Sequence, residues 1–131
     1  MLVNYKQDYQ KIAMGFLSFE EDLKDLTNLQ TELASYQNDE GHVLYLYKEN
    51  TDVNCNFSGI VGIETGDDYV LVRHLDLSPA VRSANELNRV LDELQAKVPD
   101  KKIMGSIAVT PVIMRWKETK KELPDGTNTR S

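Results

Sequence analysis

The sequence predicts one α+β domain in which helices flank a mixed, mainly antiparallel β-sheet. Strand-like runs rich in β-branched and aromatic residues alternate with amphipathic stretches of helical period along the chain. Three of these runs, within residues 42–77, follow one another with only turns between them, as antiparallel neighbours do. A helical stretch then leads to a further strand-like run, a spacing typical of a crossover between parallel strands.

The N-terminal part is predicted to form a short strand and two helices. Residues 1–6 alternate weakly, and apolar residues then recur at helical spacing over residues 9–17. Ser18 is a candidate N-cap for a second helix, whose apolar stripe spans residues 23–36. The acidic run at 20–22 is placed favourably near the positive end of that helix dipole.

Three strands are predicted over residues 42–48, 53–64 and 69–77, because each run is rich in β-branched and aromatic residues. In the first of them, tyrosines alternate with leucines, which indicates ordinary packing on two faces. Gly59 and Gly62 interrupt the second strand and predict a bulge or a close approach of neighbouring groups.

A helix, a strand and a last helix complete the predicted domain. The helix spans residues 82–97 and the strand spans residues 103–109. Thr110 is a suitable N-cap for the last helix, since Pro111 would then occupy the first helical position. Trp116, on that helix, is expected to pack in the core or at an interface.

Composition narrows the classes of function. A length of 131 residues favours a single domain, expected over residues 1–122 with a polar tail at 123–131. The net charge of −6 argues against binding to nucleic acid or to anionic membranes. We also expect neither a signal peptide nor a membrane-spanning helix. Cys55 is the single cysteine, expected to be a small buried side chain, and it fits a reducing cytoplasm.

Two stretches of sequence resemble a known family. Residues 11–19 read KIAMGFLSF, and residues 73–79 read RHLDLSP with Arg82 shortly after. Together with the element order, they resemble the GNAT (Gcn5-related N-acetyltransferase) superfamily, and the first stretch resembles the RibT-type proteins of bacterial riboflavin operons. The resemblance implies transfer of an acetyl group from acetyl-coenzyme A to an amine, here of unknown identity.

The resemblance also implies where coenzyme A would bind. Its pantetheine arm would run along the strand at 69–77, past Leu75, Asp76 and Leu77. Its pyrophosphate would lie against the following loop, where backbone N–H groups at a helix start attract anions. The residues of that loop are Arg82, Ser83, Ala84, Asn85, Glu86 and Leu87.

The loop departs from the family pattern. Asn85 and Leu87 stand where glycines are expected, although asparagine tolerates a left-handed turn, and Glu86 adds a carboxylate near the pyrophosphate position. A second hypothesis is therefore a non-catalytic binding or regulatory module that has lost this loop. Family members also continue with two further strands, so the C-terminus is expected to be truncated, and a homodimer could cover the open edge of the strand at 103–109.

Two side chains are candidates for the catalytic base. Glu64 ends the long middle strand, but the favoured interpretation is an exposed strand-end carboxylate. A histidine such as His74 can act as a base near neutral pH, but the favoured interpretation is a satisfied, partly buried side chain. By simple alternation His74 should share its face with Val72 and Asp76.

Two further kinds of chemistry find no support in the sequence. The last helix offers Met114, Arg115 and Trp116 where many relatives place an acidic tyrosine, so a general acid of the family type is not expected. No metal site is predicted, since the two histidines and Cys55 have no spacing typical of metal ligands.

Overall fold

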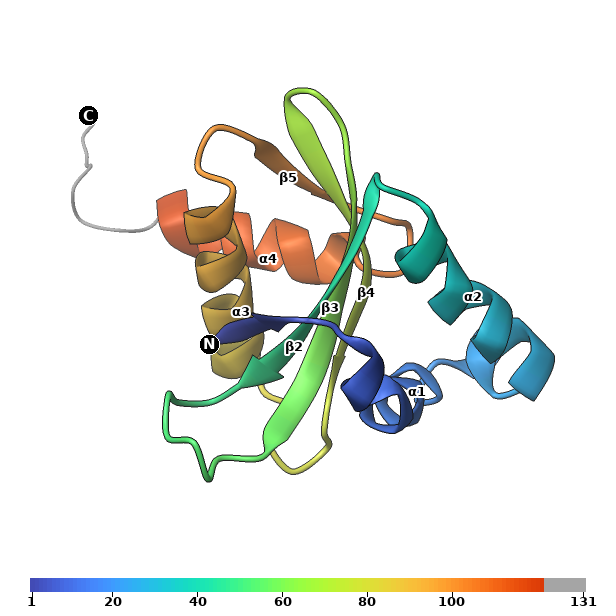
Figure 1. The fold of residues 1–131 in the computed structure, drawn as a ribbon. Helices are drawn as coiled ribbons and strands as arrows, with labels where there is room; N and C mark the ends of the chain where they lie inside the picture. Colours follow the sequence, from blue (N-terminus) through green and yellow to red (C-terminus); the bar gives the residue numbers. More distant parts are fainter. Residues whose placement is uncertain (122–131) are drawn as a thin grey trace.

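The computed structural model describes residues 1–121 and shows a twisted sheet between two helical layers (Figure 1). Helices α1 and α2 cover one face, and α3 and α4 cover the other. The elements in chain order are β1 (Leu2–Asn4), α1 (Gln10–Leu17), α2 (Leu26–Asn38), β2 (His42–Lys48), β3 (Phe57–Thr65), β4 (Tyr69–Leu77), α3 (Ala84–Lys97), β5 (Lys102–Gly105) and α4 (Thr110–Lys121). Short 3-10 turns at Gln7–Tyr9 and Glu21–Leu23 precede α1 and α2.

The strands lie in the order β1-β2-β3-β4-β5. All neighbouring pairs are antiparallel except β4 and β5, which are parallel and are joined through α3. The predicted mixed, mainly antiparallel α+β architecture and its crossover are therefore confirmed. Within residues 1–121, none of the helices combines the length and apolarity that crossing a bilayer requires. The tail predicted at 123–131 lies outside the described residues.

The sheet has a separate hydrophobic core on each face. Tyr45 and Tyr47 belong to the core under α3 and α4, whereas Leu44 and Leu46 belong to the core under α1 and α2. The predicted two-faced packing of this strand is thus confirmed. Trp116 is buried in the first core and donates its Nε1–H to Asp92 over 2.9 Å, which confirms its packing role.

A bulge at Arg73 changes the direction of the side chains in β4. The register pairs Ile63 with Val72 but Gly62 with His74, which leaves Arg73 as an extra residue. Val72 therefore packs into the core under α3 and α4, while His74 faces α2. The prediction that His74 and Val72 share a face was wrong, because alternation holds only along an unbroken strand.

Local side-chain hydrogen bonds move two element ends from their predicted positions. The middle strand begins at Phe57 rather than at residue 53, since Asp52 accepts the N–H of Asn54 and holds the chain in a turn. Cys55 lies in that turn and is only partly buried, not in the core as expected. Ser18 does not cap the second helix; it closes α1, and Asp25 caps α2.

Three further boundaries differ around the crossover. Ser83 accepts the N–H of Glu86, so α3 begins at Ala84 rather than at residue 82. The strand predicted over 103–109 ends at Gly105, where the chain turns into α4. Thr110 is not an N-cap: it is already helical, and its hydroxyl donates to the backbone carbonyl groups of Gly105 and Ser106.

Gly62 is a position in β3 where a neighbouring side chain leaves no room for a Cβ atom. A Cβ atom there would collide with the hydroxyl of Tyr36, which is buried against the sheet. Gly62→Ala should therefore lower the free energy of unfolding by about 1–3 kcal/mol, as overpacking does. Gly15→Ala is the matched control, because nothing lies near a Cβ at that helical position. It should stabilise the protein by up to ~1 kcal/mol. Urea unfolding measures both, and equal effects of the two changes would contradict this account.

Candidate functional site

Strands β4 and β5 separate halfway along β4. Their pairing ends where Val72 lies opposite Gly105, and the N–H of Ser106 then donates to the Val72 carbonyl over 2.9 Å. Beyond this point, residues 73–77 of β4 have a strand partner only in β3 among residues 1–121. Gly105 permits the departure of β5, because a Cβ there would lie 2.9 Å from the Ile113 side chain of α4. One edge of β4 is consequently open.

A cleft of about 340 Å³ occupies this opening. It is bounded by β4, by the chain before α4 and by the connection between α1 and α2. The lining residues are Glu20, Glu21, Asp22, Arg73, Leu75, Asp76, Ala108 and Val109. Four of these eight side chains are carboxyl groups and one is basic, so the cleft is acidic.

His74 lies at the base of this region with a carboxylate at each ring nitrogen. Nδ1 is 2.8 Å from Glu20 and Nε2 is 2.8 Å from Glu32. A carboxylate only accepts, so both contacts are hydrogen bonds when the ring carries two protons. Burial lowers the pKa of His74, but the two hydrogen bonds and charges outweigh burial and raise the pKa above its usual 6.5. The geometry therefore favours an imidazolium ion.

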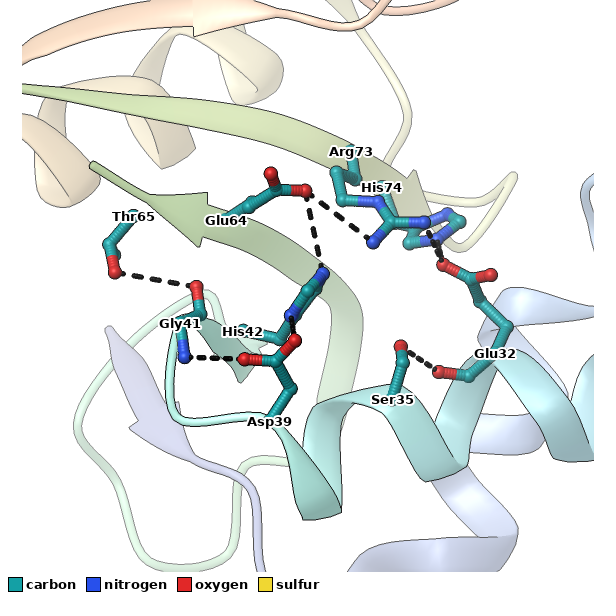
Figure 2. A network of polar contacts seen from close by, with 9 residues as sticks. All are labelled: Glu32, Ser35, Asp39, Gly41, His42, Glu64, Thr65, Arg73 and His74. Carbon is teal, nitrogen blue, oxygen red and sulfur yellow. Dashed lines mark hydrogen bonds and ion pairs between the residues drawn. The ribbon is translucent and has the colours of Figure 1, made fainter.

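Arg73 extends this network along the sheet (Figure 2). Its guanidinium lies 2.7 Å from the Glu32 oxygen that also faces His74, and 3.7 Å from Glu64. Glu64 in turn lies 3.4 Å from Nε2 of His42. The bulge makes this possible, because it directs two consecutive side chains of β4 towards α2. Glu32 is thereby the common acceptor of two cationic groups.

Asp76 is the second unusual carboxyl group of the cleft. Its Oδ2 atom is shielded from solvent, and its carboxyl group forms a hydrogen bond with that of Glu20 when one of the two carries a proton. Burial, followed by the hydrogen bond and the charge of Glu20, raises the pKa of Asp76 to about 9. Burial also acts to raise the pKa of Glu20, but its contacts with His74 and Asp76 lower it overall. The pair consequently shares one proton, held by Asp76 at neutral pH.

The structure separates the two predicted bases. Glu64 does not line the cleft and contacts His42 and Arg73. His74 lies beside the cleft, but as an imidazolium it has no free lone pair with which to accept a proton. The role of catalytic base remains a prediction for each residue, and the observed contacts favour neither Glu64 nor His74 for it.

The residues predicted to hold coenzyme A are divided among three environments. Leu75 and Asp76 line the cleft, whereas Leu77 is buried and its carbonyl accepts from Arg82 over 2.9 Å. Ala84 and Asn85 form the first turn of α3, so Asn85 makes no left-handed turn.

The last two loop residues turn away from the predicted pyrophosphate position. Leu87 packs against the core under α3 and α4. Glu86 accepts the Tyr47 hydroxyl and lies 3.6 Å from Arg89. Its carboxylate is directed into the protein. The prediction that this carboxylate would lie near the pyrophosphate position, before the helix, was therefore wrong.

Glu20 and Glu32 are the site residues that sequence reasoning missed. The acidic run at 20–22 was the available signal, but it was assigned to a helix dipole that begins only at Leu26. Ligand atoms of Glu20, His74 and Asp76 also lie within 4.8 Å of one another, a grouping that His and Cys spacing could not indicate. When His74 is protonated on both nitrogens and Asp76 holds a proton, His74 and Asp76 each donate a hydrogen bond to Glu20. The three groups then need no metal ion to balance them.

Asp76 should make stability depend on pH. Its pKa rises from 3.8 to about 9 on folding, so between these values the folded state holds a proton that the unfolded state has lost. Stability should therefore fall as pH rises through this window, with a slope of up to about 1.4 kcal/mol per pH unit. Asp76→Asn, which mimics the protonated acid, should flatten that slope in urea unfolding measured at several pH values.

The exposed Asp67 in the turn between β3 and β4 provides the control for this experiment. Asp67→Asn should leave the slope of the wild type in place. His74 contributes a separate loss of stability as pH rises above 6.5, since its folded pKa is raised, and this part should survive in Asp76→Asn. A wild-type stability that stays constant from pH 4 to 9 would refute the assignment of the proton to Asp76.

Known proteins share both sequence and fold with this chain. Over 105 residues it is 33% identical to an uncharacterized N-acetyltransferase in the lysA 3′ region of Bacillus methanolicus, a match that spans 79% of this chain and 84% of that protein. No protein-family model matches the chain.

Two solved structures have a similar fold. One, described as a probable acetyltransferase, aligns with a TM-score of 0.66 and 13% identity, covering 100% of this chain and 96% of the other. An aminoglycoside 6′-N-acetyltransferase from Acinetobacter haemolyticus aligns with a TM-score of 0.64 and 8% identity, covering 100% and 95%. At such identities these two show the fold alone. The Bacillus methanolicus relative and the acetyltransferase fold together show that the chain belongs to the GNAT superfamily of N-acetyltransferases.

Proposed function

We propose that the protein transfers an acetyl group from acetyl-coenzyme A to an amine in the cleft beside the open edge of β4. The observation that carries this proposal is the open edge of β4 over residues 73–77, directly beside the cleft. An unpaired strand edge offers backbone N–H and carbonyl groups to any extended chain that contains amides. The pantetheine arm of coenzyme A is such a chain.

The start of α3 supports a place for the pyrophosphate. Ser83 occupies the cap position, so the N–H groups of Ala84 and Asn85 lie in the first turn, where helices attract anions. Arg82 precedes the cap and adds a positive charge. Because Glu86 is turned towards Tyr47, its carboxylate does not oppose an anion there. The loop lacks glycines, so any contact here relies on a capped helix start in place of a glycine-rich turn.

Acetyl-coenzyme A would supply an activated acetyl group, and the chain would position an amine beside it. The residues available at the cleft are carboxyl groups, which can orient an amine and hold its proton. The Glu20–Asp76 pair faces this space, while Glu64 lies farther along the sheet. In this proposal Arg73 and His74 hold Glu32 and Glu20 in place rather than reacting.

The finer assignment to the RibT group is part of the same proposal. It rests on residues 11–19, most of which form α1, and α1 packs on the same face of the sheet as α2. An association with riboflavin biosynthesis would be supported by genes of that pathway beside the coding sequence. A gene context without any such genes would oppose this part of the proposal while leaving the acetyltransferase assignment intact.

Calorimetric titration with acetyl-coenzyme A tests the proposal. We expect a dissociation constant in the micromolar range for the wild type and a loss of about tenfold in Arg82→Gln, because one charge-assisted contact is removed. Arg115→Gln is the matched control, since Arg115 is exposed on α4. Thermal unfolding of each variant checks that the fold is retained, because Arg82 also bonds the Leu77 carbonyl.

Two outcomes would count against the proposal. Equal binding by Arg82→Gln and the wild type would remove the loop from the coenzyme A site. No binding at millimolar ligand would reject the cofactor altogether and return the non-catalytic module as the better description.

A further inference from the structure

We propose that Tyr47 is a positioning residue for coenzyme A, because its hydroxyl holds the Glu86 carboxylate away from the start of α3, where the pyrophosphate would bind. This inference rests on the proposed function, since it concerns the same cofactor site. It comes from the capping pattern at the start of α3, from the contacts of Glu86 and from the burial of Tyr47.

The start of α3 has the sequence of a capping box. Residues 83–86 read SANE, and in a capping box the hydroxyl of the first residue accepts the N–H of the fourth. The carboxylate of the fourth residue then accepts the N–H of the first. Ser83 forms the first of these bonds, since its Oγ accepts the Glu86 N–H over 3.1 Å. Within residues 1–121 the second bond is not formed, because the Glu86 carboxylate is directed elsewhere.

The unformed half of the capping box matters for an anion. A carboxylate in that position would occupy the N–H of Ser83 and bring a negative charge to the positive end of the helix dipole. A pyrophosphate would then meet both a blocked donor and a like charge. The orientation of Glu86 therefore determines whether the first turn of α3 remains available to a phosphate group.

Tyr47 is the contact that sets this orientation. Oε2 of Glu86 accepts the Tyr47 hydroxyl over 2.5 Å, and Oε1 lies 3.6 Å from Arg89. Tyr47 is fully buried in the core under α3 and α4, so its hydroxyl has a fixed position. The Arg89 side chain is 57% exposed, and water screens its ion pair. Arg89 alone is therefore a weak restraint on the carboxylate.

The hydroxyl of Tyr47 is a donor that persists at neutral and mildly alkaline pH. Burial, followed by the hydrogen bond and the charge of Glu86, raises the pKa of Tyr47 above its usual 10. A phenylalanine in its place would fill the same space in the core but donate nothing. Glu86 would then be free to turn back and complete the capping box with Ser83.

Calorimetric titration with acetyl-coenzyme A tests the inference through a pair of substitutions. Tyr47→Phe should raise the dissociation constant about tenfold, because the released carboxylate opposes the pyrophosphate. Glu86→Ala alone should not weaken binding. The double variant Tyr47→Phe/Glu86→Ala should return to within about twofold of the wild type, because two residues that act through one contact are not additive.

Tyr45→Phe is the matched control. Tyr45 belongs to the same strand and the same core, so this variant also loses a buried phenol hydroxyl, and it should bind acetyl-coenzyme A like the wild type. Thermal unfolding of each variant checks that the fold is retained. A loss of affinity that persists in the double variant would overturn the inference, since Tyr47 would then act only by packing against α3. Unchanged affinity in Tyr47→Phe would overturn it as well.

A crystal structure of Tyr47→Phe gives a readout that needs no ligand. The Glu86 carboxylate should accept the N–H of Ser83 in this variant, and a carboxylate still directed into the protein would overturn the inference. Failure of the wild type to bind acetyl-coenzyme A would reject the proposed function and the role of Tyr47 with it. Binding by the wild type without rescue in the double variant would reject the role of Tyr47 alone.

Discussion

Glu32 accepts hydrogen bonds from both Arg73 and His74, and the rest of the site depends on this contact. The two donors are consecutive in β4, yet both face α2 because the bulge inserts one extra residue into the strand. Buried cations are stable only when they are paired. The contact of Glu32 with Arg73 and His74 therefore fixes α2 against β4 (Figure 2). The connection before α2 then brings Glu20 to His74 and lines the cleft.

The same region explains why β4 has an open edge. β5 leaves the sheet at Gly105, where Thr110 and Ile113 of α4 lie too close for a Cβ atom. Within the part of the chain that the structure describes, the second half of β4 therefore keeps one strand partner. Acidic side chains, and not a further strand, bound the resulting space. A backbone edge and a set of carboxyl groups thus share one cleft, an arrangement suited to joining an amide-containing donor with a cationic acceptor.

The start of α3 shows how a motif can be altered without loss of its physical role. Glycine is absent from the loop, but Ser83 caps the helix and leaves N–H groups of the first turn facing outwards. Leu87 belongs to the core, which accounts for an apolar residue where the family pattern has glycine. The carboxylate of Glu86 lies 3.6 Å from Arg89 and accepts the Tyr47 hydroxyl, so it points away from the space before the helix.

The order of the elements, the antiparallel run from β2 to β4, the parallel crossover to β5 and the two-faced packing of Tyr45 and Tyr47 could all be predicted from the sequence. These features follow from periods of two and about four residues, which are local properties of the chain. Element ends were less predictable, because single side chains such as Asp52 and Ser83 decide them. The loop residues at 82–87 were named from a family resemblance, and their orientations were not determined.

The centre of the site could not be predicted, because it is assembled by tertiary contacts. The bulge at Arg73 exists relative to the register of β3, so no pattern within β4 could reveal it. Glu20 and His74 are 54 positions apart, and Glu32 and His74 are 42 positions apart, with no spacing that relates them. The proton on Asp76 likewise depends on burial and on the approach of Glu20. Such protonation states arise from distances between distant segments, which the linear order of residues does not contain.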